Sequence, residues 1–397
     1  MLDPRIAERS ALLLLSVCAF SSMASLRMCD AMLPHLATEF SASLPRVAVV
    51  ISSFALAYGV LQIFYGPLGD RFGKIRVVGW ATLLCTVGSA GATMAPTLDW
   101  LIAWRTASGA AAAGIIPLAM AWIGDNVAYE RRQEVLARFL GATVFGMICG
   151  QWLGGWIAST AGWRTVFGLM TVTFFVAGIF AVARGSITAT IHIHQQVKAR
   201  DRILNVFSIS WSRVILTMTF LEGALVFGVI AFIPTFLHER YGLSTAAAGA
   251  VTAMYGVGGL LYSRLARMML SRVGETGLAK GGGGCLGIAF VTIAAASHWA
   301  WAIPACFLAG FGFYALHNTL QVHATQMAPR FRGTAVSLFA CVLFIGQSVG
   351  VVSASFLAQG VSLAGIIAIA GCCLAWVGWR LGAQITGHAR EAEVRNT

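Results

Sequence analysis

Long apolar runs dominate the sequence, and the short polar segments between them hold most of its charge. A helix needs about 20 predominantly apolar residues to cross the hydrocarbon layer of a bilayer. Runs of about this length lie at residues 11–36, 46–68, 77–97, 99–122, 139–158, 165–184, 213–237, 245–266, 281–298, 300–325, 333–355 and 362–382. The pattern predicts an all-α polytopic membrane protein with twelve transmembrane helices, which we number spans 1 to 12.

The composition excludes a soluble, disordered or fibrous protein. Of the 397 residues, 58% are hydrophobic and only 11% are charged, whereas soluble domains carry about 25% charged residues. The nine cysteines lie within apolar runs and have no metal-ligand spacing. The sequence also contains no G-x-S-x-G, no H-E-x-x-H and no phosphate-binding loop. We therefore expect no enzyme activity, no catalytic residue, no metal and no cofactor.

The basic residues predict how the chain is oriented. The formal net charge is +12, and 22 of the 27 lysines and arginines fall in the two termini and in alternate loops. Such residues concentrate on the cytoplasmic side of membrane proteins. We expect an integral protein of the cytoplasmic (inner) membrane of a bacterium, with both termini cytoplasmic. This location explains the charge without a nucleic-acid partner, since the basic loops flank a lipid bilayer.

The two halves of the chain resemble each other weakly. The segment Tyr58–Tyr65 matches Tyr255–Tyr262, and Gly150-Gln151 matches Gly346-Gln347, at offsets of 197 and 196. We expect two pseudo-symmetric six-helix bundles, residues 1–184 and 213–397, as in transporters that work by alternating access. Residues 185–212 form the predicted cytoplasmic linker. His192 and His194 lie in it and could bind a metal, but a basic linker against anionic lipid is the favoured interpretation.

The loop between spans 2 and 3 carries the clearest motif. It reads Gly-Pro-Leu-Gly-Asp-Arg-Phe-Gly-Lys-Ile-Arg from Gly66 to Arg76. This stretch resembles the cytoplasmic loop motif of the major facilitator superfamily, and the span number and the half-way linker extend that resemblance to the whole chain. It implies that Gly66, Asp70, Arg71, Gly73 and Lys74 form a latch between the halves on the cytoplasmic side. The alternative is a turn that only fixes the topology. In the second half, Arg267 aligns with Asp70 and the glycines are lost.

Spans 4 and 5 resemble two further motifs of the family. Span 4 contains Arg105 within an apolar run, where an arginine is costly and usually functional. It is expected to serve a proton relay or an ion pair, unless it snorkels to the outer surface. Span 5 is similar to the antiporter motif of drug-exporting members, but Gln151 replaces the proline of that motif. The replacement removes the expected kink and places a polar side chain in a helix interface. The alternative is that the glycines of span 5 serve only helix packing.

Two acidic residues lie well inside apolar spans. Asp30 in span 1 follows Arg27 by three residues, so the two share a helix face and can pair. Glu222 in span 7 has no basic residue nearby in sequence, and a buried carboxyl of this kind can carry a proton. We expect Asp30, Glu222, Arg105 and Arg27 to serve proton coupling. The alternatives are a neutralised ion pair for Asp30 and a hydrogen bond that locks helices for Glu222.

Span 10 places polar groups in the membrane. His317 and Gln321 share a helix face, and Asn318 lies beside them. With Gln151, these residues are expected to line the substrate cavity, although they could equally bond neighbouring helices. His323 lies nearer the cytoplasmic end and is expected to contact lipid headgroups.

These features predict a secondary active transporter. The favoured function is proton-coupled efflux, by antiport, of small hydrophobic or amphiphilic molecules through alternating access. The alternative is a proton-coupled importer of a small organic solute such as a sugar or an organic acid. A membrane-embedded enzyme or sensor on the same scaffold has little support. The expected partners are protons, the small-molecule substrate and the lipid bilayer, and the expected state is a monomer.

Overall fold

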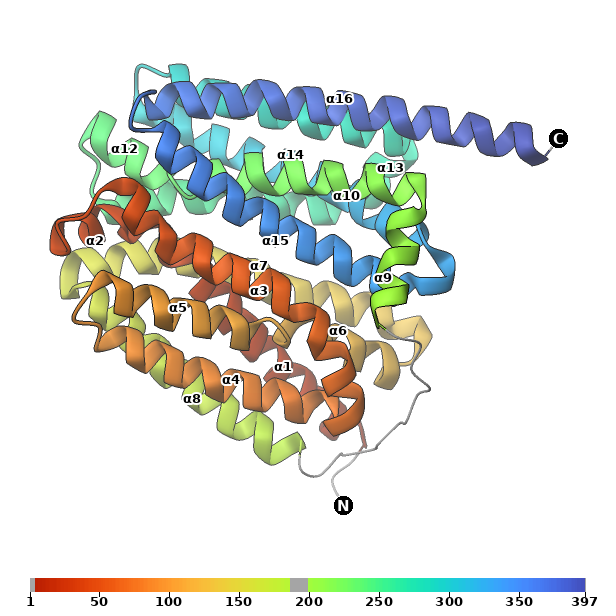
Figure 1. Cartoon of the computed structure of the whole chain (residues 1–397), viewed down its shortest axis with the longest axis horizontal. Helices are drawn as coiled ribbons and strands as arrows, with labels where there is room; N and C mark the ends of the chain where they lie inside the picture. The colour runs from red at the N-terminus through yellow and green to blue at the C-terminus, as the bar shows by residue number, and fades with distance from the viewer. Residues whose placement is uncertain (1–3, 186–198, 397) are drawn as a thin grey trace. The chain divides into compact units, whose positions relative to one another are not determined.

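The computed structural model describes residues 4–185 and 199–396, and these residues contain helices and no strand (Figure 1). Within the described ranges, eleven helical segments are long and apolar enough to cross a membrane. The longest, α13 (Thr245–Ala295), has 51 residues and is broken at Gly274, where φ is 66° and ψ is 178°. At 1.5 Å per residue, 51 residues would be more than twice the roughly 30 Å of hydrocarbon. Because α13 therefore forms two spans, the prediction of twelve transmembrane helices is confirmed.

Spans 1 to 6 contain η1 and α1 to α8. Their bounds are α1 (Pro4–Arg27), η1 (Asp30–Met32), α2 (Leu33–Glu39), α3 (Leu44–Phe72), α4 (Lys74–Thr93), α5 (Leu98–Ala112), α6 (Ile115–Asn126), α7 (Tyr129–Ala161) and α8 (Trp163–Gly185). The remaining bounds are α9 (Ala199–Ser208), α10 (Ser210–Glu222), the π-helical η2 (Gly223–Phe227), α11 (Gly228–Ile230), α12 (Ile233–Tyr241), α13, η3 (Trp299–Trp301), α14 (Ala302–Gln326), η4 (Pro329–Phe331), α15 (Arg332–Leu357) and α16 (Leu363–Asn396).

The chain divides into two compact units. Unit 1 comprises Met1–Val197 with Ser244–Gly249, and unit 2 comprises Lys198–Leu243 with Ala250–Thr397. In unit 1, α4 packs along α8 and α1 along α7 (Figure 1). Of the predicted linker, residues 186–198, with His192 and His194, lie outside the described residues, whereas residues 199–208 form α9. We call the end of each unit that carries the basic loops its basic end; it is the end expected to be cytoplasmic.

Prolines account for breaks in spans 1, 4 and 7. A proline has no N–H to offer the carbonyl four residues earlier and collides with it. Pro34 thus interrupts span 1 at Asp30, Pro117 interrupts span 4 at Ala113, and Pro234 interrupts span 7 near Ile230. Span 7 has a second irregularity, the π-helical turn η2, that directly follows Glu222. Single π turns inside α-helices are rare and frequently lie at functional sites.

Glycines set the register in which helices pack within each unit. A Cβ atom added to Gly150 of α7 would collide with the carbonyl of Ala24, and one added to Gly350 of α15 with the carbonyl of Ala224. The residue numbers of these two contacts differ by 200. The sequence alignment of Gly150 with Gly346 is therefore wrong by one helical turn. A motif that repeats small residues every four positions fits equally well after a shift of four, so its spacing alone does not define the register.

Candidate functional site

Asp30 lies at the break in span 1 and is fully buried. Its Oδ2 atom lies 3.5 Å from Nη1 of Arg27 and accepts a hydrogen bond of 3.4 Å from Nε2 of Gln151. Among the described residues, Oδ1 of Asp30 has no hydrogen-bond partner. The structure thus brings together three of the predicted residues, Arg27, Asp30 and Gln151, on two packed helices. A carboxylate with one bonded and one open oxygen can accept a proton without losing its position.

Gln151 stands in α7 at the position where the resembled motif has a proline. The helix α7 runs without interruption from Tyr129 to Ala161, as expected for span 5 without a kink. Its neighbour Gly150 lets the backbone of α7 approach Ala24 of α1 closely. At this short separation the amide of Gln151 reaches across to Asp30. Gln151 is therefore a partner of the buried acid within unit 1, where its side chain is 3% exposed.

Arg105 joins three spans of unit 1. Its Nη1 atom donates to the carbonyl and the hydroxyl of Ser25, at 3.1 and 3.2 Å, and its Nε atom donates to the carbonyl of Val50 at 3.4 Å. The guanidinium lies 4.1 Å from the centre of the Phe54 ring, a favourable cation–π geometry. Only 1% of the residue is exposed. The snorkelling alternative is therefore wrong, because the side chain turns inward to carbonyl groups of spans 1 and 2.

Glu222 lies at the junction of α10 and the π-helical turn and is fully buried. Nδ1 of His317 lies 2.9 Å from its Oε2 atom. The imidazole stacks on Phe313, with ring centres 4.9 Å apart, and is packed near Phe339. Among the described residues, Oε1 of Glu222 has no hydrogen-bond partner. His317, predicted to line the substrate cavity, is therefore placed as the direct partner of Glu222 in unit 2.

In the described part of the chain, neither of the other predicted cavity residues of span 10 is hydrogen-bonded to Glu222 or His317. Asn318 is exposed and Gln321 is partly buried, whereas the His317 side chain is 17% exposed.

Gln347 of α15 lies next to the Glu222 cluster, although in the sequence it stood out only as part of the internal repeat. The side chain is fully buried, and neither its amide oxygen nor its amide nitrogen has a hydrogen-bond partner among the described residues. Its backbone packs against Gly223, the residue that follows Glu222. A buried amide without partners is costly, and this one lies beside the buried acid of unit 2. The sequence could have pointed to Gln347, because the Gly346-Gln347 pair places a polar residue in an apolar span.

The loop between spans 2 and 3 forms a brace inside unit 1. Gly73 ends α3 with φ of 90° and ψ of 127°, a conformation that favours glycine. The ammonium of Lys74 lies 3.5 Å from Oδ1 of Asp70 and also pairs with Asp125 at the end of α6. Arg71 lies over the ring of Phe72. Asp125 was not among the residues predicted from the sequence, although it is an acid at the end of span 4 that carries the basic loop.

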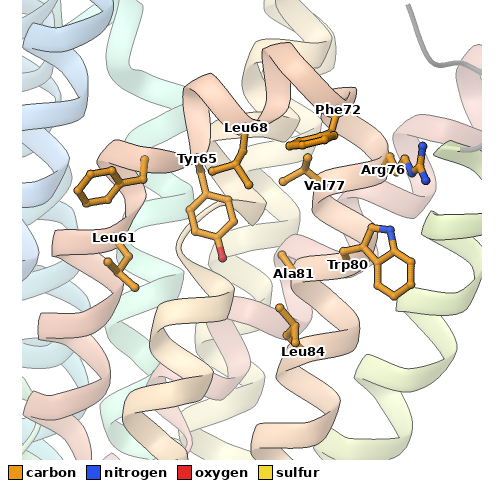
Figure 2. A pocket seen from close by; sticks show the side chains of 10 residues that line it. Leu61, Tyr65, Leu68, Phe72, Arg76, Val77, Trp80, Ala81 and Leu84 are labelled. Atoms are coloured by element: carbon orange, nitrogen blue, oxygen red, sulfur yellow. The ribbon is translucent and has the colours of Figure 1, made fainter. Parts of the chain in front are cut away.

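A groove of about 440 Å³ lies between α3 and α4 toward the basic end of unit 1 (Figure 2). Figure 2 shows apolar side chains from both helices along it, with Trp80 and Arg76 near one end. Leu68 and Trp80 are 42% and 52% exposed, as expected of side chains that face lipid. None of the predicted site residues lines this groove. Nor do three His, Cys, Asp or Glu side chains gather as metal ligands anywhere in the described part of the chain.

Comparisons with known proteins agree on the family. The sequence matches the Major Facilitator Superfamily over residues 15–351. The uncharacterized MFS-type transporter YceJ of Bacillus subtilis is 25% identical over 343 residues, which cover 83% of this chain and 84% of that protein. The multidrug export protein EmrB of Haemophilus influenzae is 32% identical over 155 residues, but these cover 39% of this chain and 30% of that protein. The crystal structure of the peptide transporter POT has the same fold, with a TM-score of 0.75 at 16% identity over 96% of this chain and 95% of that one.

The family match and the fold support each other. The matched residues take in spans 1 to 11, and the structure provides the twelve spans in two units. Proteins of this family are membrane transporters rather than enzymes. The chain belongs to the Major Facilitator Superfamily.

Proposed function

We propose that this transporter is a proton-coupled exporter of small hydrophobic or amphiphilic molecules. One observation carries the proposal: among the described residues, each unit buries one carboxylate that has a bonded oxygen and an open one, at a break in its helix. An ionised group at such depth is costly, and its protonation removes the cost. A proton taken up there changes which conformation the unit prefers. The relative EmrB, which is named as a multidrug export protein, supports efflux.

The residues of each unit have distinct roles in this proposal. Asp30 and Glu222 take up protons. When the proton leaves, Arg27 stabilises the carboxylate of Asp30 and His317 that of Glu222. Arg105 holds spans 1, 2 and 4 around Asp30. His317, Asn318, Gln321 and Gln151 contact the substrate. A solute that hydrogen-bonds Gln347 would satisfy its buried amide.

The setting of this activity is part of the same proposal. The protein works as a monomer in the inner membrane of a bacterium, with both termini in the cytoplasm and two six-helix bundles, residues 1–184 and 213–397, joined by a cytoplasmic linker. The loop that contains Gly66, Asp70, Arg71, Gly73 and Lys74 acts on the cytoplasmic side as the latch that the family resemblance implies. The ion pairs of Lys74 with Asp70 and with Asp125 give the loop a fixed shape for that role.

A substrate screen in everted membrane vesicles tests the proposal. The vesicles are acidified by respiration, and a fluorescent dye reports the internal proton concentration as each compound is added. An exporter releases protons when its substrate arrives, and Glu222→Gln or Asp30→Asn abolishes the release. Glu134→Gln is the matched control, because Glu134 is an exposed acid that pairs with Arg138 on its own helix. If no lipophilic cation or drug produces a response in the wild type, multidrug efflux is rejected.

The contact between Gln151 and Asp30 favours a second candidate, a proton-coupled importer of a small organic solute. Exporters of the resembled motif have a proline where Gln151 stands, whereas here an amide bonds the buried acid. Uptake of labelled sugars, organic acids and metabolites into intact cells distinguishes the two. An importer accumulates its substrate together with protons, and an exporter lowers its internal concentration.

A further inference from the structure

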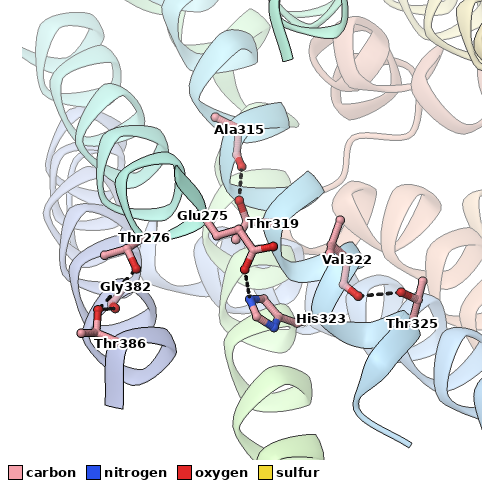
Figure 3. A network of polar contacts seen from close by, with 9 residues as sticks. All are labelled: Glu275, Thr276, Ala315, Thr319, Val322, His323, Thr325, Gly382 and Thr386. Atoms are coloured by element: carbon pink, nitrogen blue, oxygen red, sulfur yellow. Dashed lines mark hydrogen bonds and ion pairs between the residues drawn. The ribbon is translucent and has the colours of Figure 1, made fainter. Parts of the chain in front are cut away.

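A titratable side-chain cluster lies at the basic end of unit 2. Glu275 follows directly after the break at Gly274, and its Oε2 atom lies 3.3 Å from Nε2 of His323 near the end of α14 (Figure 3). The His323 side chain is 11% exposed and that of Glu275 is 42% exposed. The expectation that His323 contacts lipid headgroups is therefore wrong, because its imidazole turns into the bundle toward Glu275.

An indole and a second imidazole complete the cluster. Trp211 of α10 presents its ring at 79° to His323, with ring centres 5.4 Å apart. The same indole stacks flat on His388 of α16, at 4.2 Å and 1°. A hydrogen bond of 3.3 Å between Thr276 and Thr386 also joins α13 to α16 (Figure 3). Side chains from spans 7, 9, 10 and 12 thus meet at one place.

The charged surroundings of His323 are simple. Among the residues whose side chains the structure describes, the ionisable groups that act on it are Glu275 from α13 and His388 from α16. From α10 it meets the uncharged ring of Trp211, while Arg213 of that helix is bonded to carbonyls of α9. Arg330 and Arg332, which follow α14 in the chain, are exposed. Burial of the imidazole opposes a proton on His323, the Glu275 carboxylate favours one, and a charged imidazole at His388 would oppose it.

The same place in unit 1 holds a pair of fixed charge. There, Gly73 has a positive φ, and Lys74 directly after it pairs with Asp125 at the end of span 4. In unit 2, Gly274 has a positive φ, and Glu275 directly after it pairs with His323 near the end of span 10. The expectation that the second copy loses its glycines is therefore wrong, because Gly274 keeps the turn. The acid and the base have changed places, and the base has become a histidine.

This exchange matters because of ordinary side-chain pKa values. Lysine and aspartate titrate near 10.4 and 3.9, so neither changes charge around neutral pH. Histidine titrates near 6.5, within the range of intracellular pH changes. A contact of His323 with the Glu275 carboxylate is an ion pair only while the imidazole is protonated. The Lys74–Asp125 pair keeps its charges throughout.

We propose that Glu275, His323 and His388 form a pH sensor at the basic end of unit 2. When His323 gains a proton, its contact with Glu275 becomes an ion pair that ties span 9 to span 10. When the proton leaves, the tie weakens and these spans separate more easily. His388, stacked on Trp211, places a second imidazole on the same indole that His323 contacts. The sensor goes beyond the proposed function, since none of its residues binds substrate.

A double-mutant cycle on the full-length purified protein tests the sensor. The variants are Glu275→Gln, His323→Gln and the double variant, and the measurement is the thermal unfolding midpoint at pH 6 and at pH 8. We expect the coupling between the two positions, the part of the midpoint shift that is not additive, to be clearly larger at pH 6. The matched cycle of Lys74→Gln and Asp125→Asn in unit 1 is expected to give the same coupling at both values. Equal coupling of Glu275 and His323 at pH 6 and pH 8 overturns the proposal.

A second measurement does not depend on the variants' stability. Protonated imidazole quenches the fluorescence of a neighbouring indole, so the emission of Trp211, obtained as wild type minus Trp211→Phe, is expected to fall between pH 8 and pH 5.5. His323→Gln removes part of this fall and His388→Gln the remainder. If the difference emission does not change over this range, the imidazoles beside Trp211 do not titrate there, and the sensor is rejected.

Discussion

Buried polar side chains in the spans differ in how many of their hydrogen bonds are made. Arg105 donates to two carbonyls and one hydroxyl and lies over an aromatic ring, so it acts as a tie between helices. Asp30 and Glu222 each use one oxygen and leave the other open. Gln347 uses neither of its amide atoms. Unsatisfied groups cost stability. A proton or a solute could therefore make the hydrogen bonds that Asp30, Glu222 and Gln347 leave open.

Gln347 allows a prediction in which stability and activity change in opposite directions. Gln347→Leu removes a buried amide without partners, so we expect the unfolding free energy to rise by up to about 1–3 kcal/mol. Transport is expected to fall several-fold, because a hydrogen bond to the solute is lost. The measurements are the thermal midpoint in detergent and the vesicle assay. In the control Gln151→Leu the midpoint is expected to fall, since the donor to buried Asp30 disappears. If Gln347→Leu also lowers the midpoint, Gln347 is a structural residue.

Which of these residues the sequence could reveal depends on their separation along the chain. Arg27 and Asp30 are three residues apart, so helical spacing alone predicted their contact. Glu222 and His317 are 95 residues apart, and so they appeared as an isolated acid and a separate cavity residue. The contact of Gln151 with Asp30 spans 121 residues. The polar residues could be selected because apolar spans make them conspicuous, whereas their pairing required the helix packing.

At the scale of helices, some of the irregular turns could be predicted from the sequence and one could not. Pro34, Pro117 and Pro234 lie in apolar runs, and each removes the hydrogen bond to a carbonyl four residues earlier. The breaks at Asp30, Ala113 and Ile230 could therefore have been predicted. No proline accounts for the π-helical turn after Glu222, where Gly223 packs directly on the backbone of Leu343. That irregularity arises from a contact between helices, so a single helix sequence contains no sign of it.

The loop between spans 2 and 3 provides a prediction at this scale. Gly73 has φ of 90° and ψ of 127°, which another residue adopts at a cost of about 1–3 kcal/mol. Gly73→Ala is therefore expected to lower the thermal midpoint and to disturb the Lys74–Asp125 pair. Gly66, from the same motif, lies inside α3 with open space where a Cβ would be. Gly66→Ala is expected to be neutral or to stabilise the helix by up to about 1 kcal/mol. Equal losses in both variants would contradict the assignment of the turn to Gly73.

For the whole molecule, hydropathy predicted the number of spans better than their lengths. Residues 11–36 were expected for span 1, and the helical segment runs from Glu8 to Glu39. Residues 267–280 were expected to be a polar loop, yet helix continues on both sides of Gly274. Apolar runs mark only the part of a helix that lies in hydrocarbon. The polar ends of helices, which form the braces at the basic ends, therefore had to come from the structure.

The five basic residues outside the basic ends each have a partner in their own unit. Arg27 and Arg105 are bonded within unit 1 as described, Arg46 pairs with Asp99 and Arg164 pairs with Glu39. Arg240 in unit 2 donates to the carbonyls of Ala294 and Ala296. These partners either neutralise the charge of the five arginines or accept hydrogen bonds from their guanidinium groups. The prediction that both termini are cytoplasmic then rests on the 22 remaining lysines and arginines.

Fusions to alkaline phosphatase test this orientation, because the enzyme needs disulfides that form outside the cytoplasm. Each fusion joins the phosphatase to the chain after a residue in a loop or at the end. Fusions after Gly162 and Gly242, which end spans 5 and 7, are expected to be active, and fusions after Gly73 and Thr397 inactive. The reason is that the basic loops resist translocation while the few basic residues at the opposite end are held by partners. The reverse pattern would place both termini outside, and activity after both Gly162 and Thr397 would mean that an even number of spans, not the expected seven, separates Gly162 from the end of the chain.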